Sequence, residues 1–261
     1  MLNKVDINSF SSEGDMRTRI KTDLDDIGYI VLTNVDVSEM DRCSDFFLAT
    51  SEAIGEPQGH DANNKIIWDI KSNASSGSLI KTYSEHSHEA QLHTDSQYSF
   101  YPEDYFGLLT LKKADCGGGI SYLLSLEEIL GELRKLPNGE QIIETLSNTS
   151  YPFIVPNVFK KDDSLEQEFN YGPILRPNEI RFRIDTFEKA LLKLDGYCSE
   201  EQLEAYHALK KIAIESKSIK SFFLEEGDLI YINNKTMLHG RGEFSDSSRH
   251  LLRIRMNKFQ S

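Results

Sequence analysis

Three side chains in this sequence have the types and spacing needed to hold a metal ion. His93 and Asp95 stand two residues apart, so in an extended segment both side chains leave the same face of a strand. A third ligand is offered by His239, which follows an apolar run at 228–234 that is typical of a strand. Two imidazoles and one carboxylate suit ferrous iron, and three protein ligands leave the other coordination positions open.

The same residues have a simpler interpretation, because an H-x-D triplet taken alone is more often a strand pair or a solvated loop. Three further features favour a metal site. His239 follows a predicted strand late in the chain, Arg249 and Arg253 come after His239, and the glycine run 117–119 follows the first two ligands. The combination predicts the facial triad of non-haem Fe(II) oxygenases.

Composition limits the class of protein. A chain of 261 residues without a Pro- or Gly-rich linker predicts a single domain over 1–261. The excess of 42 Asp and Glu over 29 Lys and Arg argues against nucleic acid or an anionic membrane as a partner. Three widely spaced cysteines indicate free thiols in a reducing compartment. Since no segment resembles a signal peptide or a membrane span, we expect a cytoplasmic protein.

Hydrophobic periodicity predicts a mainly β fold with helical inserts. Expected helices cover 11–26, 38–54, 125–135, 139–146 and 199–215. Expected strands cover 29–34, 65–69, 79–83, the segment around His93, 105–111, 120–124, 151–155, 180–184, 221–225, 228–232 and 251–256, with a loop at 160–168. This order predicts a double-stranded β-helix (jelly-roll) core, with helices at the N-terminus and a helical insert between core strands.

The motifs resemble those of a known family. His93-Thr94-Asp95, the distal His239 and the pair Arg249 and Arg253 resemble the Fe(II)/2-oxoglutarate-dependent oxygenases, in the group of taurine dioxygenase and the clavaminate-synthase-like amino-acid hydroxylases. The resemblance covers the chain from Tyr29 to Met256. It implies that the triad holds Fe(II), that 2-oxoglutarate chelates the metal, and that O2 is consumed while succinate and CO2 are released. Because Asp95 occupies the carboxylate position, the resemblance implies hydroxylation rather than halogenation.

The resemblance also assigns residues to the cosubstrate. Arg249 matches the arginine that grips the far carboxylate of 2-oxoglutarate, a role suited to the planar guanidinium fork. The alternative for Arg249 is a surface salt bridge. Ser121 stands where relatives carry a threonine after a Gly-Gly turn, although here the glycines also suit an ordinary turn. Arg253 matches the position that meets an acidic group of the substrate. Arg255, two residues on, would lie on the same face of a strand. An alternative alignment, in which Arg253 holds the cosubstrate, is therefore also open.

Two acids are candidates for the substrate side. Asp185 resembles an acid that amino-acid hydroxylases present to a substrate amine, and its alternative is an exposed strand end. Glu89 lies four residues before His93, and its alternative is a solvated position. His86 and His88 are interpreted as loop residues, and His60, His207 and His250 as structural.

The sequence thus predicts a hydroxylase of a small polar molecule with an acidic group, an amino acid or a derivative in secondary metabolism, free or bound to a carrier protein. Desaturation, epimerisation or ring closure by the same cofactors is one alternative, and a non-catalytic jelly-roll that binds a metal or ligand is another. A metal-assisted hydrolase is disfavoured because no H-E-x-x-H motif is present. A dimer is expected only because dimers are common.

Overall fold

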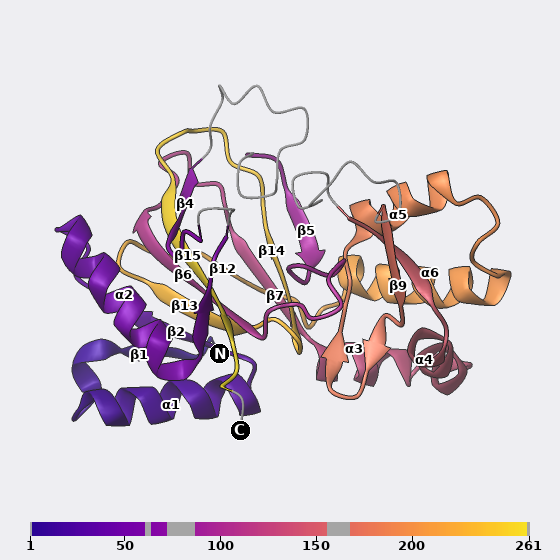
Figure 1. Ribbon diagram of the computed structural model, residues 1–261, viewed down its shortest axis with the longest axis horizontal. Helices are drawn as coiled ribbons and strands as arrows, with labels where there is room; N and C mark the ends of the chain where they lie inside the picture. Colours follow the sequence, from indigo (N-terminus) through magenta and orange to yellow (C-terminus); the bar gives the residue numbers. More distant parts are fainter. Residues whose placement is uncertain (1, 61–63, 72–86, 156–167, 260–261) are drawn as a thin grey trace.

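The computed structural model describes residues 2–60, 64–71, 87–155 and 168–259. Its centre consists of two sheets (Figure 1). The larger sheet has the order β1 (Lys4–Asp6), β2 (Tyr29–Thr33), β13 (Leu229–Asn233), β6 (Tyr105–Lys112), β15 (His250–Asn257) and β3 (Glu56–Gln58), and β4 (Trp68–Lys71) also pairs with β15. The smaller sheet has the order β12 (Lys220–Phe222), β7 (Ser121–Ser125), β14 (Met237–Arg241) and β5 (Ala90–His93). The predicted jelly-roll core is confirmed.

Helices cover the outer face of the larger sheet. A short 3-10 helix (Ile7–Ser9) leads into α1 (Glu13–Asp26), and α2 (Met40–Ile54) follows β2. The N-terminus of α1 is capped by Ser12, whose hydroxyl accepts a hydrogen bond from the Asp15 amide. Apolar residues of both helices pack against the outward residues of β6, β13 and β15, including Leu252 and Ile254. Both helices were predicted from their spacing of apolar residues, and both are present.

The outer face of the smaller sheet is covered by the segment between β7 and β12 (Figure 1). The described part of this insert contains four helices and four short strands, namely α3 (Leu126–Leu133), α4 (Gly139–Asn148), β8 (Tyr151–Ile154), β9 (Phe169–Gly172), β10 (Leu175–Arg176), β11 (Glu179–Ile180), α5 (Ile184–Lys193) and α6 (Glu200–Glu215). Capping boxes begin α3 at Ser125 and α6 at Ser199. Outward side chains of the sheet, such as Leu92, Leu124 and Leu238, join the apolar core of the insert.

The space between the two sheets determines which side chains reach the site. Leu123, Met237 and Leu251 belong to the core between the sheets. Since side chains alternate along a strand, the residues two positions away share this inward face. His239 on β14 and Arg253 on β15 therefore point between the sheets, where Phe106 of β6 also lies.

Several predicted elements need correction. The strand expected at 180–184 is wrong, because β11 ends at Ile180 and helix α5 begins at Ile184. His239 follows the strand predicted at 228–232, which is β13, but it lies within a further strand, β14, that was not predicted. The strand expected at 65–69 is displaced to Trp68–Lys71. The strand expected at 79–83, His86 and all of the loop at 160–168 except its last residue lie outside the described residues.

Two expectations about the whole chain can be compared with the structure. Cys43, Cys116 and Cys198 are free thiols, as expected. Among the described residues, no helix has both the length and the apolar character needed to cross a membrane.

Candidate metal centre

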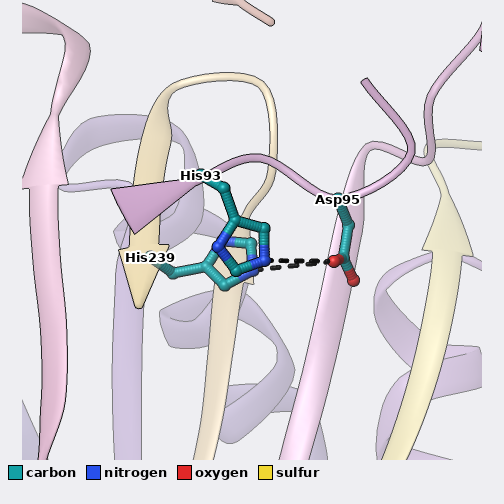
Figure 2. A group of neighbouring side chains, drawn as sticks. All are labelled: His93, Asp95 and His239. Carbon is teal, nitrogen blue, oxygen red and sulfur yellow. Dashed lines mark ion pairs between the residues drawn. The ribbon is translucent and has the colours of Figure 1, made fainter. Parts of the chain in front are cut away.

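The two candidate imidazole ligands come from neighbouring strands. His93 is the last residue of β5, His239 lies in the middle of β14, and the antiparallel register pairs them directly. Their rings are 4.3 Å apart between centroids. Asp95 is not part of the strand, as the extended interpretation assumed, but lies in the turn after β5, where Ser96 adopts a positive φ of 51°. The turn nevertheless brings the carboxylate to face both rings (Figure 2).

The donor atoms of the three side chains converge. Oδ1 of Asp95 lies 3.7 Å from Nε2 of His93 and 3.8 Å from Nε2 of His239. One ligand atom from each residue lies within 4.8 Å of the others, and His93 and Asp95 are buried or nearly so. Two nitrogens and one oxygen on one side of a common point are the donor set of a 2-His-1-carboxylate iron site. The three side chains therefore fit a single ion held between them.

Contacts behind the imidazoles set their orientation. Nδ1 of His93 lies 2.7 Å from the carbonyl oxygen of Gln91, so this nitrogen carries a proton, and Nε2 is the ring nitrogen that faces Oδ1 of Asp95. The ring of His239 packs on Phe106 with 4.4 Å between centroids. Burial, and then the neighbouring His93, lower the pKa of His239 to about 4. His239 is therefore neutral near pH 7, which is the form that binds a metal.

The two oxygens of Asp95 have different partners. Oδ1 faces the imidazoles, whereas Oδ2 lies 3.3 Å from Nη1 of Arg253 and 3.6 Å from Nε of Arg255. Burial of the Asp95 carboxyl raises its pKa, but the two guanidiniums outweigh burial and hold the pKa well below its usual range. The carboxylate is therefore charged, and only one of its oxygens faces the position of the ion.

Arg249 lies just before β15 and is 8 % exposed. Its guanidinium stacks on Phe244 at 5.2 Å, and no ion pair with a carboxylate joins it to any described residue. Burial, followed by nearby Arg241, lowers the pKa of Arg249 to about 9. A cavity of about 210 Å³ lies beside it, lined also by Gly117, Gly118, Gly119 and Thr110. Arg249 is thus a buried cation facing a cavity rather than part of a surface salt bridge.

The remaining predicted site residues, which are Ser121, Asp185 and Glu89, lie in different parts of the structure. Ser121 begins β7 and shares the inward parity of Leu123 in that strand. Asp185 lies in the first turn of α5, where Arg183 binds it with Nε–Oδ1 of 2.7 Å and Nη2–Oδ2 of 3.2 Å. Glu89 is exposed just before β5. Among the described residues, the group of converging ligand atoms consists of His93, Asp95 and His239, and it includes neither Asp185 nor Glu89.

The helical insert holds the turn that carries Asp95. The amide of Thr94 donates to the carbonyl of Phe182 at 2.8 Å, and the amide of Phe182 donates to the Thr94 hydroxyl at 3.1 Å. The buried guanidinium of Arg181 donates two hydrogen bonds, of 3.0 and 2.7 Å, to the carbonyl of Gln97. The insert is therefore bonded to the turn on both sides of Asp95.

The sequence interpretation missed three residues at the centre, which are Asn234, Arg255 as a partner of Asp95, and Glu103. Asn234 ends a predicted strand, and an Asn-Asn pair at that place indicates only a turn. Glu103 lies in a polar stretch between strands. One signal in the sequence was available. Arg253 and Arg255 lie on the same face of the last predicted strand, and two arginines buried on that face need acidic partners.

The chain resembles known proteins both in its match to a family model and in its fold. The model of the family described as "Taurine catabolism dioxygenase TauD, TfdA family" matches residues 2–255. No curated protein matches the chain in a sequence search. Asparagine oxygenase in complex with Fe(II), 2S,3S-3-hydroxyasparagine and succinate is similar in structure, with a TM-score of 0.71, 16% identity, and coverage of 94% of this chain and 79% of that chain.

A second oxygenase is equally similar. The non-heme iron oxygenase OrfP in complex with Fe, succinate and (3S)-hydroxy-L-Arg has a TM-score of 0.71 and 15% identity, over 95% of this chain and 81% of that chain. The same enzyme with Fe and alpha-ketoglutaric acid has a TM-score of 0.69 and 16% identity, over 97% of this chain and 88% of that chain. Identities this low establish a common fold, and the match to the family model covers nearly the whole chain.

Proposed function

Because the chain belongs to the taurine catabolism dioxygenase TauD, TfdA family, we propose that His93, Asp95 and His239 hold Fe(II) for the hydroxylation of an amino acid or a derivative. The predictions of a dioxygenase and of iron and 2-oxoglutarate as its cofactors are confirmed at the level of the family. The observation that carries the proposal is the convergence of the two imidazoles of His93 and His239 on one oxygen of the charged Asp95 carboxylate.

The bound iron would supply the oxidising chemistry, in which 2-oxoglutarate and O2 give succinate, CO2 and an oxidant for the substrate C–H bond. The protein has the tasks of holding, orienting and shielding. Burial of the three ligands keeps water from competing for them, and the fixed tautomer of His93 presents Nε2 without rearrangement. With three protein ligands, the bound ion would keep its other coordination positions open to cosubstrate and oxygen.

Arg249 is proposed to bind the far carboxylate of 2-oxoglutarate. Its guanidinium is buried, has no carboxylate partner among the described residues, and lines a cavity. Arg253, by contrast, is already paired with Asp95. This difference favours Arg249 over Arg253 for the cosubstrate. Ser121, which begins β7 with inward parity, is proposed as a hydroxyl partner of the same carboxylate.

The glycine run offers a test of this assignment. Gly117 and Gly119 both have positive φ, of 74° and 78°, so alanine at either costs about 1 kcal/mol of backbone strain. A Cβ at Gly119 would lie 3.3 Å from Nε of Arg249, whereas a Cβ at Gly117 meets nothing within 4 Å. We expect both alanine variants to lose similar stability in urea, and only Gly119→Ala to raise the KM for 2-oxoglutarate, by about tenfold.

KM values for 2-oxoglutarate that stay at the wild-type level in both glycine variants would contradict the assignment of Arg249 to the cosubstrate. A rise in both would place the effect in the turn itself rather than in the arginine.

Arg253 is proposed to meet an acidic group of the substrate. It lies beside the carboxylate ligand, and its buried Nε has no hydrogen-bond partner among the described residues, so the guanidinium keeps donor capacity. The products named in the related structures, hydroxyasparagine and hydroxy-arginine, are amino acids, which supports a substrate of that class. Glu89 and Asp185 remain candidates for a substrate amine, although Asp185 is already bound by Arg183. A free or a carrier-bound amino acid is compatible with these contacts.

The substrate class is tested by a screen. Purified protein with Fe(II) and 2-oxoglutarate is incubated with each of the twenty amino acids and with taurine, and succinate is measured. We expect at least one amino acid to stimulate succinate formation about tenfold or more above the uncoupled rate. The product should gain one oxygen atom in mass, whereas the loss of two hydrogen atoms would assign desaturation.

Iron-dependent succinate formation that no amino acid stimulates would remove the proposed substrate class but keep the cofactors. A protein that binds 2-oxoglutarate and iron without any turnover would instead support the alternative of a non-catalytic binding protein.

A further inference from the structure

One buried asparagine holds both backbone groups of the carboxylate ligand. The Asp95 amide donates to Oδ1 of Asn234 at 2.7 Å, and Nδ2 of Asn234 donates to the Asp95 carbonyl at 3.1 Å. Asn234 is 1 % exposed. Its amide orientation is determined by these partners, because an N–H must face an oxygen and a carbonyl must face the NH2 group. We propose that Asn234 is a positioning residue that fixes Asp95 for metal binding.

The same asparagine also binds the far end of the loop. Nδ2 of Asn234 donates to the carbonyl of Glu103 at 2.9 Å, and its backbone amide donates to the carbonyl of Asp104 at 2.8 Å. The loop between Asp95 and Glu103 is thereby closed at its base by one side chain. Because residue 234 lies in the turn between β13 and β14, the contact joins the loop of Asp95 to the strand that carries His239.

The side chains of the two acids are joined as well. Arg255 reaches Oδ2 of Asp95 through Nε at 3.6 Å and Oε1 of Glu103 through Nη1 at 3.4 Å. Asn234 therefore binds the backbones of Asp95 and Glu103, and Arg255 binds their carboxylates. In this closed frame the Asp95 backbone cannot turn, and Oδ2 is occupied by arginine, so that Oδ1 is the oxygen left to the ion.

A role limited to folding would give a different pattern from a positioning role. Asn233, the preceding residue, is also a buried asparagine with two side-chain hydrogen bonds, donating to the Leu24 carbonyl at 3.1 Å and accepting from the Lys235 amide at 3.1 Å. Neither of these two bonds involves Asp95 or Glu103. Asn233→Ala is therefore a matched control, with a loss of buried hydrogen bonds at the end of β13, directly before the turn that contains Asn234.

The inference rests on the proposed iron site, and it is tested by metal affinity rather than by turnover. Fe(II) is titrated anaerobically into metal-free wild type, Asn234→Ala and Asn233→Ala, and the Kd is measured by calorimetry. Loss of a partner behind a metal ligand weakens affinity by about 10- to 100-fold. We expect a loss of about tenfold or more for Asn234→Ala and less than about twofold for Asn233→Ala.

Equal Kd values for Asn234→Ala and wild type, or equal losses in both asparagine variants, would overturn the inference. If Asn234→Ala does not fold, Asn234→Ser is used, since its hydroxyl can bond to one loop segment but cannot bridge both, and an unchanged Kd in that variant would equally overturn it. The visible spectrum of the Co(II) form gives a second measurement, and a changed band pattern only in the Asn234 variant supports the inference. Tight Fe(II) binding by wild type without amino-acid turnover counts against the proposed substrate alone.

Discussion

Asparagine in place of Asp95 is expected to abolish iron-dependent succinate formation and to lower the free energy of unfolding of the metal-free protein by about 3 kcal/mol. The first effect follows from the loss of a charged ligand. The second follows because Arg253 and Arg255 lie against Oδ2 of Asp95, and all three side chains are at most 13 % exposed. Removing the carboxylate leaves two buried cations with one remaining acid, Glu103. Urea unfolding without metal and a succinate assay with Fe(II) measure the two effects.

His93→Ala separates these effects. It should reduce turnover by at least about 100-fold, since even partners behind a ligand are worth 10- to 100-fold. It leaves the pairs between Asp95 and the arginines intact, so the stability loss should be smaller than in Asp95→Asn. His207→Ala, an exposed position on α6, should change neither quantity. Full turnover in His93→Ala would remove the metal assignment, and equal stability of wild type and Asp95→Asn would show that the arginines do not need the carboxylate.

Methionine in place of Arg249 is expected to weaken 2-oxoglutarate binding by about 100-fold. A hydrogen bond to a charged group contributes about 1.5–3 kcal/mol, each 1.4 kcal/mol is tenfold in affinity, and a guanidinium makes two such bonds to one carboxylate. Arg249→Lys keeps the charge but not the planar fork, and should lose part of the affinity. Titration of 2-oxoglutarate into the Fe(II) protein under argon, followed by its visible charge-transfer band, measures the Kd directly.

Two further variants serve as controls for Arg249→Met. Lys113 lines the same cavity but is paired with Glu225 at 2.6 Å, so Lys113→Met is the control for a lost cation and should change the Kd by less than about twofold. Arg253→Met should affect the KM for the substrate more than the Kd for 2-oxoglutarate. The opposite pattern, with 2-oxoglutarate binding lost in Arg253→Met and kept in Arg249→Met, would show that Arg253 holds the cosubstrate.

Much of the fold could be predicted because the buried apolar residues recur along the sequence with the period of a helix or of a strand. The strands β2, β6, β7, β13 and β15 and the helices α1, α2, α3, α4 and α6 follow from that period, and the capping box at Ser125 from its spacing. Strand β14, which carries His239, was not predicted. The strand expected at 180–184 failed although its alternation is real. Ile180, Phe182 and Ile184 are all buried, but Arg181 between them is buried too. The amides of Ile180 and Phe182 bond to the Lys235 carbonyl and the Thr94 hydroxyl, so no continuous ladder forms.

The convergence of the three candidate ligands could be predicted, whereas the residues that position them could not. His93, Asp95 and His239 carry chemistry that few other residue types supply, and their convergence needs only two neighbouring strands. In a regular strand, side chains four residues apart lie on the same face. Arg249 and Arg253 are four residues apart, but the pairing of β15 shifts in register between His250 and Leu251, so this rule does not apply to them. Asn234 acts through backbone groups more than a hundred residues away, for which the sequence contains no local signal.

The bonds between the insert and the turn at 94–97 have a practical meaning for anyone redesigning this scaffold. Thr94 and Gln97 rest on Phe182 and Arg181, which belong to the segment that appears in Figure 1 as a separate lobe of helices. A minimised catalyst made by cutting out that lobe and joining β7 to β12 would keep every ligand in its sequence. It would nevertheless lose the hydrogen bonds from Arg181 and Phe182 that hold the turn containing Asp95.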